Sequence, residues 1–249
     1  MKPISRSRED LAMLVLSEQQ LDWLCERIPD APINPKGGRP PISKRNAIRG
    51  IFWILDNGAK WKDLPREFGS KSAVHRWFST WVKAGVFEQL MREAGKLVES
   101  RGEYNVYECF IDGSFAKCRG GGDGIGVGKA GKGVRIMLMV DARGLPVAVD
   151  AASANPHESK LVQPLFEFML TTETPGRVIG DKAYDNDALD AELSEIGVEL
   201  IAPHRANRTK DRTQDGRPLR RSSRRWIVER TISWFQNYRR LCIRWEKSS

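Results

Sequence analysis

From about Asn105 to Leu241 two kinds of segment follow each other: segments in which every second residue is hydrophobic, as in strands, and segments in which every third or fourth residue is, as in helices. This succession constrains the fold more than any other feature. VYECFIDGS has the alternation of a short strand, and VRIMLMVDARGLPVAVDAAS indicates two strands joined by a turn at residues 141–144. HESKLVQPLFEFML and NDALDAELSEIG have helical spacing, whereas RVIGDKAYD and VELIAP are typical of strands. RRSSRRWIVERTISWFQNYRRL predicts a last amphipathic helix. The predicted order is strand, strand, strand, helix, strand, helix, strand, helix.

Three meandering strands followed by alternating helices predict a mixed five-stranded sheet flanked by helices on both faces. The predicted fold class is therefore α/β of the RNase-H-like kind. A dinucleotide-binding Rossmann domain would instead begin with strand, helix, strand.

The glycine-rich stretch GGGDGIGVGKAGKG, residues 120–133, contains the spacing G-x-G-x-x-G and most of a P-loop. Both phosphate-binding motifs need a helix directly after the glycines. Here a strand-like segment follows, and Gly133 stands where a P-loop has Ser or Thr. We therefore expect no nucleotide cofactor and interpret the stretch as a mobile connection between the first two strands. Its Lys129 and Lys132 are candidates for contacts with a nucleic-acid backbone.

Residues 17–100 are predicted to be helical. Ser17 is a candidate N-cap for LSEQQLDWLCERI, and Ser43 begins a second helix that ends at Gly58. The segment WKDLPREFGSKSAVHRWFSTWVKAG then resembles a helix-turn-helix: a short helix, a turn at Gly69-Ser70 and a second helix. The alternative is an ordinary helical hairpin with a solvated face. The polar residues early in the second helix, where a recognition helix would meet DNA, are Lys71, Ser72, His75 and Arg76.

The net charge of +9 indicates a polyanionic partner, and the distribution of charge is more informative than the total. Between His204 and Arg230 ten Lys or Arg residues stand against three acids. Arg221, Arg224 and Arg225 are the candidates for phosphate contacts, because guanidinium groups match phosphate oxygens. The alternative is a solvated basic loop.

The remaining composition argues against several other classes of protein. No apolar run approaches the ~18 residues of a membrane span, and the start MKPISRSREDLAML lacks the apolar core of a signal peptide. The four cysteines and three histidines do not form zinc-site or disulfide patterns, so free thiols are expected. These features predict a soluble, cytoplasmic protein without a membrane partner.

Three isolated acids carry the candidate chemistry. Asp112 ends the first predicted strand and Asp181 ends the fourth, and these two strands are expected to be neighbours at the centre of the sheet. Glu229 lies on the last helix, which can pack across the same edge. Three converging carboxylates repel one another unless a cation intervenes, and oxygen ligands without Cys or His select Mg²⁺ or Mn²⁺. Two such ions can catalyse phosphodiester displacement, although each acid alone would be interpreted as a turn or solvated residue.

Other polar residues near these acids have two interpretations. Asp185 is either a second acid of the site or, as we favour, a turn residue. His157 and Glu158 either simply begin a helix capped by Asn155 or Ser153, which we favour, or lie at the rim of the acidic site.

At this point the chain resembles the DDE transposases of bacterial insertion sequences, in the insertion-sequence family numbered five. The resemblance extends from about Leu16 to the end of the chain, through IRGIFWILDNGAKWKDLP, IDGS, GDKAYD and WIVERTISWFQNYRRL. It implies that Asp112, Asp181 and Glu229 bind two Mg²⁺ or Mn²⁺ ions. It also implies binding of double-stranded DNA at terminal inverted repeats, strand cleavage by water, and attack of the freed 3′-hydroxyl on target DNA.

The resemblance divides the chain into a tail (1–16), a helical DNA-binding domain (17–100) and an RNase-H-like catalytic domain (105–249). Joining two DNA ends implies a homodimer in the active state. Ser222 and Gln236 occupy positions where related transposases carry Tyr and Lys, and the chain stops at Ser249, where relatives continue. Two alternatives therefore stay open: a catalytically inactive remnant that only binds DNA, and a metal-dependent nuclease that cuts without joining. Trp226 and Trp234, near Glu229, are interpreted as core residues rather than as base-stacking platforms.

Overall fold

The computed structural model describes residues 16–30, 41–209, 211, 213–214 and 216–245. Of the predicted tail only Leu16 is described, and the last four residues lie outside the described part. The chain divides into two compact units, residues 1–91 and 92–249. The division falls within helix α4 (Val86–Ser100).

The N-terminal unit is helical, and its caps are the ones that the sequence predicts. Helix α1 (Glu18–Arg27) begins with a capping box in which Ser17 and Gln20 satisfy each other's backbone N–H groups. Helix α2 (Lys44–Asn57) is capped by the Ser43 side chain and ends at Gly58, whose φ of 57° is the left-handed conformation that glycine adopts most easily. Each cap satisfies backbone groups that a helix end leaves without partners.

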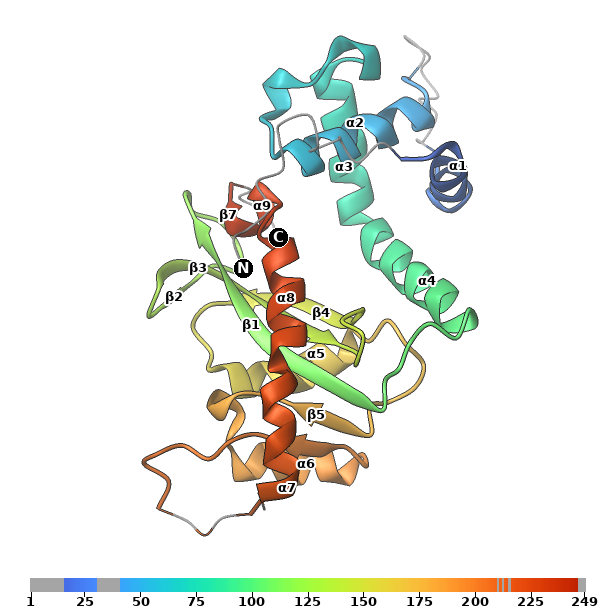
Figure 1. The fold of residues 1–249 in the computed structure, drawn as a ribbon. Helices are drawn as coiled ribbons and strands as arrows, with labels where there is room; N and C mark the ends of the chain where they lie inside the picture. Colours follow the sequence, from blue (N-terminus) through green and yellow to red (C-terminus); the bar gives the residue numbers. More distant parts are fainter. Residues whose placement is uncertain (1–15, 31–40, 210, 212, 215, 246–249) are drawn as a thin grey trace, which may run out of the picture. The chain divides into compact units, whose positions relative to one another are not determined.

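The predicted short helix before Gly69 is two separate turns of 3-10 helix, η1 (Trp61–Asp63) and η2 (Arg66–Phe68). Pro65 stands between them and cannot continue a helical hydrogen-bond ladder. The predicted second helix is present as α3 (Lys71–Lys83), and the side chain of Ser70 caps it. Val74, Trp77 and Trp81 of α3 are buried against α1 and α2, so these helices form one core (Figure 1).

The C-terminal unit is built on one mixed sheet. Its strands are β1 (Glu108–Cys118), β2 (Gly126–Gly128), β3 (Gly131–Val140), β4 (Pro146–Ser153), β5 (Arg177–Ile179), β6 (Glu199–Ile201) and β7 (Ile243–Arg244). The five predicted strands are β1, β3, β4, β5 and β6, and the short β2 and β7 are added to them at the edge of β3 and at the end of β1.

The strand order places β1 at the centre, as predicted. β3 lies antiparallel between β1 and β4, while β5 pairs parallel with β1 and β6 pairs parallel with β5. Numbered as the five predicted strands, the order is 3-2-1-4-5 with only the second strand antiparallel to the rest. This is the mixed sheet of an RNase-H-like fold.

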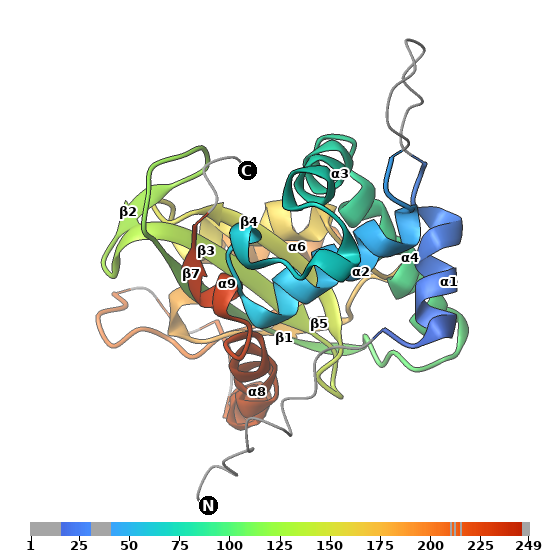
Figure 2. The same cartoon turned by 90° about the horizontal axis from the view of Figure 1, so that it is seen from above.

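Helices cover both faces of this sheet (Figures 1 and 2). One face carries Cys109, Ile111 and Met137 and packs against α5 (Val162–Glu167) and α6 (Asp187–Glu195). The other face carries Phe110 and Ile179 and packs against α8 (Trp226–Phe235). Because side chains of a strand alternate between faces, the core residues of β1 determine which of its polar residues face α8.

Two predicted helices are interrupted. The segment after β4 forms η3 (Glu158–Leu161) and the short α5, and the cap of η3 is the His157 side chain instead of Asn155 or Ser153. The last helix is preceded by α7 (Gly216–Leu219) and the 3-10 run η5 (Arg220–Arg225), and α9 (Arg239–Cys242) follows it. In η5 the hydroxyl groups of Ser222 and Ser223 donate to carbonyls three residues earlier, which competes with α-helical bonding.

The glycine-rich stretch connects the first two predicted strands, as expected, and its second half forms a β-hairpin that the sequence did not predict. β2 pairs with the start of β3, from Gly126 opposite Gly133 to Gly128 opposite Gly131. A Cβ on Gly126 would lie 2.2 Å from Ser153 Oγ, so the glycine permits the hairpin to approach the end of β4. The Asn155 side chain accepts a hydrogen bond from Val127 N there.

Within the described ranges, no helix is both long and apolar enough to cross a membrane. The four cysteines are free, as predicted.

Candidate active site

Asp112 lies within β1, which continues to Cys118, and so does not end its strand as the sequence predicts; Asp181 lies two residues beyond the end of the neighbouring strand β5. The parallel register pairs Cys109 with Val178 and Phe110 with Ile179. The parallel pairing ends there, and Asp112 and Asp181 each lie two residues beyond the last paired positions. Phe110 and Ile179 face α8, and residues two positions further along a strand share that face. Asp112 is therefore on the α8 side of the sheet, whereas Asp181 caps the turn η4 (Lys182–Tyr184) by accepting Ala183 N–H at 2.7 Å. The charge of Asp181 raises the pKa of Asp112, so the two carboxylates are electrostatic neighbours.

Arg225 connects Asp112 to the third predicted acid, Glu229. Its Nη2 lies 3.3 Å from Asp112 Oδ2 and 3.5 Å from Glu229 Oε1. The side chains of Arg225 and Asp112 are 22% and 20% exposed, whereas Glu229 is 55% exposed. Because Glu229 follows Arg225 by four residues, one helical turn at the start of α8 presents both groups to the middle of β1.

Burial raises the pKa of Asp112 above its usual value. The Gly113 N–H, which donates to Asp112 Oδ1 at 2.8 Å, and the Arg225 guanidinium lower this pKa, while the charges of Asp181 and Glu229 raise it. The three predicted acids are thus electrostatic neighbours. Their mutual repulsion is the condition that a bound cation would relieve.

The chemistry of these acids fits a divalent metal ion, because all three supply carboxylate oxygens. In the conformation described, however, no group of three or more His, Cys, Asp or Glu among the described residues is close enough to hold one ion. The Arg225 guanidinium instead lies between Asp112 and Glu229 and supplies the positive charge there.

Glu158 brings a further carboxylate to the same part of β1 from the opposite face of the sheet. A Cβ on Gly113 would lie 3.4 Å from Glu158 Cδ, and Glu158 forms a 2.9 Å ion pair with Arg135. Its pKa is raised, chiefly by burial and then by Asp181 and Asp112, against the lowering effect of Arg135. Of the two interpretations of Glu158, the structure therefore favours the rim of the acidic site.

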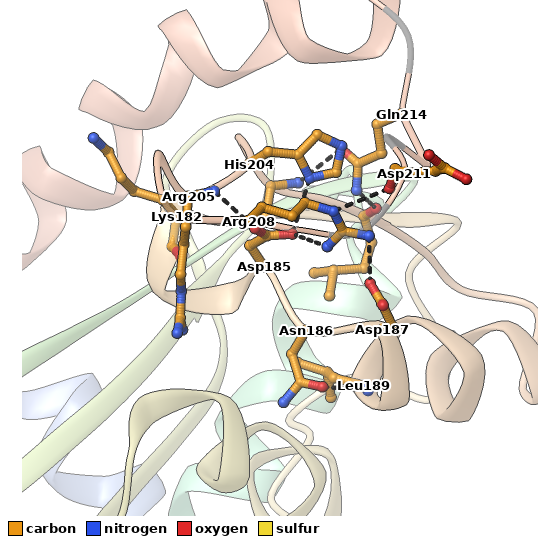
Figure 3. Close-up of polar contacts among 12 residues, drawn as sticks. Lys182, Asp185, Asn186, Asp187, Leu189, His204, Arg205, Arg208, Asp211 and Gln214 are labelled. Atoms are coloured by element: carbon orange, nitrogen blue, oxygen red, sulfur yellow. Dashed lines mark hydrogen bonds and ion pairs between the residues drawn. The ribbon is translucent and has the colours of Figure 1, made fainter.

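Asp185 has a structural role, as favoured from the sequence. Its carboxylate accepts hydrogen bonds from Arg205 N (2.7 Å) and Arg208 Nη1 (2.9 Å) and lies 2.9 Å from His204 Nδ1 (Figure 3). These contacts hold the pKa of Asp185 below its usual value despite burial. Asp185 therefore fastens the segment after β6 to the turn that follows Asp181.

Arg221 and Arg224 already have a protein partner, which the sequence did not indicate. Both guanidinium groups bind the carboxylate of Glu108, which is only 5% exposed. A buried carboxylate needs such charge compensation. Arg224 also lies over the ring of Phe110, 5.4 Å from its centroid. The two arginine side chains are 42% and 45% exposed, so part of each is accessible to solvent.

The other predicted DNA contacts are exposed. Lys71, Ser72, His75 and Arg76 lie on the exposed side of the first turns of α3, and the His75 ring packs edge-on against Trp61 with centroids 4.8 Å apart.

Lys129 and Lys132 are exposed at the β2–β3 hairpin. Trp226 and Trp234 are not core residues: each is 53% exposed, and Arg230 lies 5.0 Å from the centroid of both rings. An apolar residue on an amphipathic helix looks the same in sequence whether its face is buried or exposed, which explains the error.

Two sequence families match the chain. Residues 107–249 match the family described as "Transposase DDE domain", and residues 16–91 match "Putative transposase of IS4/5 family (DUF4096)". The first match covers more than half of the chain and contains Asp112, Asp181 and Glu229. The chain belongs to the transposase DDE domain family.

Curated relatives include products of one insertion element, IS402 of Burkholderia cepacia. The chain is 29% identical over 127 residues to the "Putative transposase for insertion sequence element IS402", covering 48% of this chain and 56% of that protein. It is 32% identical over 91 residues to the "Insertion element IS402 uncharacterized 16.2 kDa protein", covering 36% and 62%. The alignments thus span about three-fifths of these relatives' own lengths.

Solved structures with some likeness are also transposases. The cryo-EM structure of the piggyBac transposase synaptic complex with hairpin DNA aligns at 12% identity and a TM-score of 0.41, covering 74% of this chain and 48% of that one. The catalytic domain of Mos1 mariner transposase aligns at 7% identity and a TM-score of 0.28, covering 62% and 91%. At these TM-scores the alignments add nothing to the strand order described above.

Proposed function

We propose that the chain binds the terminal inverted repeats of an insertion sequence of the family numbered five and catalyses DNA cleavage and strand transfer. The observation that supports this proposal best is the electrostatic proximity of the three acids: Asp181 and Glu229 both raise the pKa of Asp112, and Arg225 lies between Asp112 and Glu229. Membership of the transposase DDE domain family supports it.

In the proposed mechanism Asp112, Asp181 and Glu229 hold two Mg²⁺ or Mn²⁺ ions. When bound, such a pair supplies an activated nucleophilic oxygen and stabilises the leaving oxygen of a phosphodiester. Asp112 is ionised above its raised pKa and presents Oδ2 to the site, while Gly113 N–H holds its Oδ1. Arg225 must give up its position between Asp112 and Glu229, and a released guanidinium can bind a DNA phosphate.

Double-stranded DNA is the proposed partner of two surfaces. The exposed polar residues of α3 would contact the inverted repeat, and Lys129 and Lys132 of the hairpin would follow the backbone. Arg221 and Arg224 are proposed to add phosphate contacts through their exposed faces. Because strand transfer joins both ends of an element to one target, we propose at least a homodimer as the active species, acting on DNA in the bacterial cytoplasm.

A labelled DNA that carries the element's terminal repeat tests the proposal. With Mg²⁺, cleavage followed by joining supports it, cleavage alone indicates a nuclease, and binding alone indicates an inactive remnant. The last outcome has one observation in its favour, namely the Arg225 guanidinium between two of the acids.

Asp112→Asn should abolish cleavage but leave DNA binding unchanged. Asp150→Asn is the matched control, because the Asp150 carboxylate also accepts a bond from the next backbone N–H, at 2.7 Å, but lies outside the acidic site. Undiminished cleavage by the Asp112→Asn variant would exclude the assigned site.

A further inference from the structure

Two carboxylates reach β1 near Gly113 from opposite faces of the sheet, and only one of them has a proposed role. Asp112 lies on the α8 side, whereas Glu158 comes from η3 on the other side. The carboxyl carbon of Glu158 would lie 3.4 Å from a Cβ on Gly113, which is an ordinary van der Waals distance. The glycine therefore places no side chain between Glu158 and the backbone next to Asp112.

The edge of β1 beside these residues is open. β5 pairs with β1 only as far as Phe110, and β7 pairs with it again from Lys117 onwards. Between these two positions, no other strand of the described residues pairs with this edge. Side chains from both faces of the sheet can therefore meet around the edge, which a continuous neighbouring strand would prevent.

Each of the two carboxylates is held by an arginine. Asp112 pairs with Arg225 at 3.3 Å, and Glu158 pairs with Arg135 at 2.9 Å. The two acids are similarly shielded, with 20% and 23% of their side chains exposed. Burial raises the pKa of both acids, and the charge of Asp181 also raises both. Glu158 thus belongs to the same electrostatic cluster as the predicted acids.

A buried hydroxyl group without a partner is the second observation at this site. Tyr184 is fully buried, and among the described residues its hydroxyl has no hydrogen-bond partner. The ring packs directly on Gly180, where a Cβ would lie 2.5 Å from Tyr184 Cδ2. Burial raises the pKa of this hydroxyl, and the charges of Glu158, Asp112 and Asp181 raise it further, that of Glu158 most. A buried donor without an acceptor costs ~1–3 kcal/mol, and an acceptor in another state of the site would explain its presence.

We propose that Glu158 is a fourth carboxylate of the metal site, and that the Tyr184 hydroxyl positions it by donating to one of its oxygens once Glu158 has left Arg135. The inference rests on the proposed function, because it concerns the same two ions. Two divalent ions carry more positive charge than three carboxylates balance, and a further glutamate supplies the oxygen ligand that such ions prefer. A hydrogen bond to a ligating carboxylate fixes its orientation, which is the role assigned to Tyr184.

The affinity for Mn²⁺, measured by electron paramagnetic resonance on the DNA-free chain, tests the role of Glu158. Glu158→Gln should weaken binding by roughly 10-fold or more. Glu158→Asp keeps the charge but shortens the side chain, and it should weaken binding as well. Glu199→Gln is the matched control, because Glu199 also pairs with an arginine, Arg177 at 3.1 Å, but at the other end of the parallel strands. It should leave the affinity unchanged.

Water-proton relaxation counts the water molecules on the bound Mn²⁺ and separates a ligand from a nearby charge. If Glu158 is a ligand, water takes its place in Glu158→Gln, and the number of bound waters rises. If Glu158 acts only through its charge, this number stays the same.

Tyr184→Phe tests the positioning role, because it removes only the hydroxyl. The variant should bind Mn²⁺ roughly 10-fold more weakly. Without metal, its free energy of unfolding should be unchanged or higher, since a buried donor without a partner is lost. Tyr104→Phe is the matched control. It removes a hydroxyl that donates to the Pro146 carbonyl at 3.0 Å, so it should lower the free energy of unfolding and leave the Mn²⁺ affinity unchanged.

The possible failures are distinguishable. If Asp112→Asn weakens Mn²⁺ binding but Glu158→Gln does not, Glu158 is no ligand and the proposed function stands. Wild-type affinity in Glu158→Asp together with an unchanged number of waters in Glu158→Gln leaves Glu158 only an electrostatic effect. Wild-type affinity in Tyr184→Phe excludes the positioning role. A wild-type chain that binds no Mn²⁺ overturns this inference and the proposed function together.

Discussion

Replacing Arg225 with glutamine should tighten the binding of Mn²⁺ at the acidic site. The guanidinium lies 3.3 Å from Asp112 and 3.5 Å from Glu229, so a metal ion between these acids must displace it. A hydrogen bond between charged groups contributes ~1.5–3 kcal/mol, and the long Asp112 contact belongs at the lower limit. The Glu229 contact is 55% exposed and adds ~0.5 kcal/mol or less after solvent screening. A total of ~1.5–2 kcal/mol corresponds to roughly a 10- to 30-fold increase in affinity.

The signal of free Mn²⁺ in electron paramagnetic resonance measures this affinity without requiring activity. Arg224→Gln is the matched control. It removes an equal charge from the residue next to Arg225, and the Arg224 side chain binds Glu108 instead of Asp112. Arg225 lowers the pKa of Asp112, so its loss raises that pKa further. The gain should therefore shrink as the pH falls and protons compete for Asp112. Unchanged or weaker binding, or an equal gain in Arg224→Gln, would refute displacement of Arg225.

Three further substitutions test other parts of the catalytic unit. Burial and the nearby Asp187 raise the pKa of Asp190 to about 6. Asp190→Asn should therefore raise the free energy of unfolding at pH 7 by ~1–3 kcal/mol, but not below about pH 4, where the acid is neutral in both the folded and the unfolded state. An equal gain at both pH values would contradict this. Asp141 is fully buried and accepts hydrogen bonds from three backbone N–H groups. Asp141→Ala should therefore lower the free energy of unfolding, measured by chemical denaturation, by ~3–5 kcal/mol, whereas a decrease below ~1 kcal/mol would show that water or the turn replaces these bonds. Glu108→Gln frees two arginines and should steepen the salt dependence of DNA binding by up to about 1.8 if both then contact phosphates; an unchanged slope would assign them a structural role alone.

Sequence patterns predicted the elements that depend on interactions between close neighbours in the chain. Ser17 and Ser43 cap helices because their hydroxyl groups reach a backbone N–H three residues ahead. Pairing of β1 with β5 was also predictable, because the order of strands and helices leaves few ways to build a mixed sheet. The sequence therefore predicted that the strands before Asp112 and Asp181 are neighbours, although Asp112 lies within β1 instead of at its end.

Partners of the charged side chains depended on the tertiary structure. Arg221 and Arg224 read as free cations in a basic run, yet they bind a carboxylate 113 and 116 residues earlier in the chain. Glu158 meets the acidic site because η3 carries it beside Gly113 of β1, a distant part of the chain. Likewise, His157 and Arg205 are 48 residues apart in the chain, yet Nε2 of one lies 3.3 Å from Nη2 of the other.

The sequence by itself thus determined the strand order, several helix caps and the two central carboxylates. Only the tertiary structure decided which arginine lies between the acids and which ones compensate a buried glutamate. The physical reason is range. Capping and hydrophobic periodicity act over a few residues, whereas an ion pair forms wherever folding leaves a carboxylate buried, and long side chains reach it from distant parts of the chain.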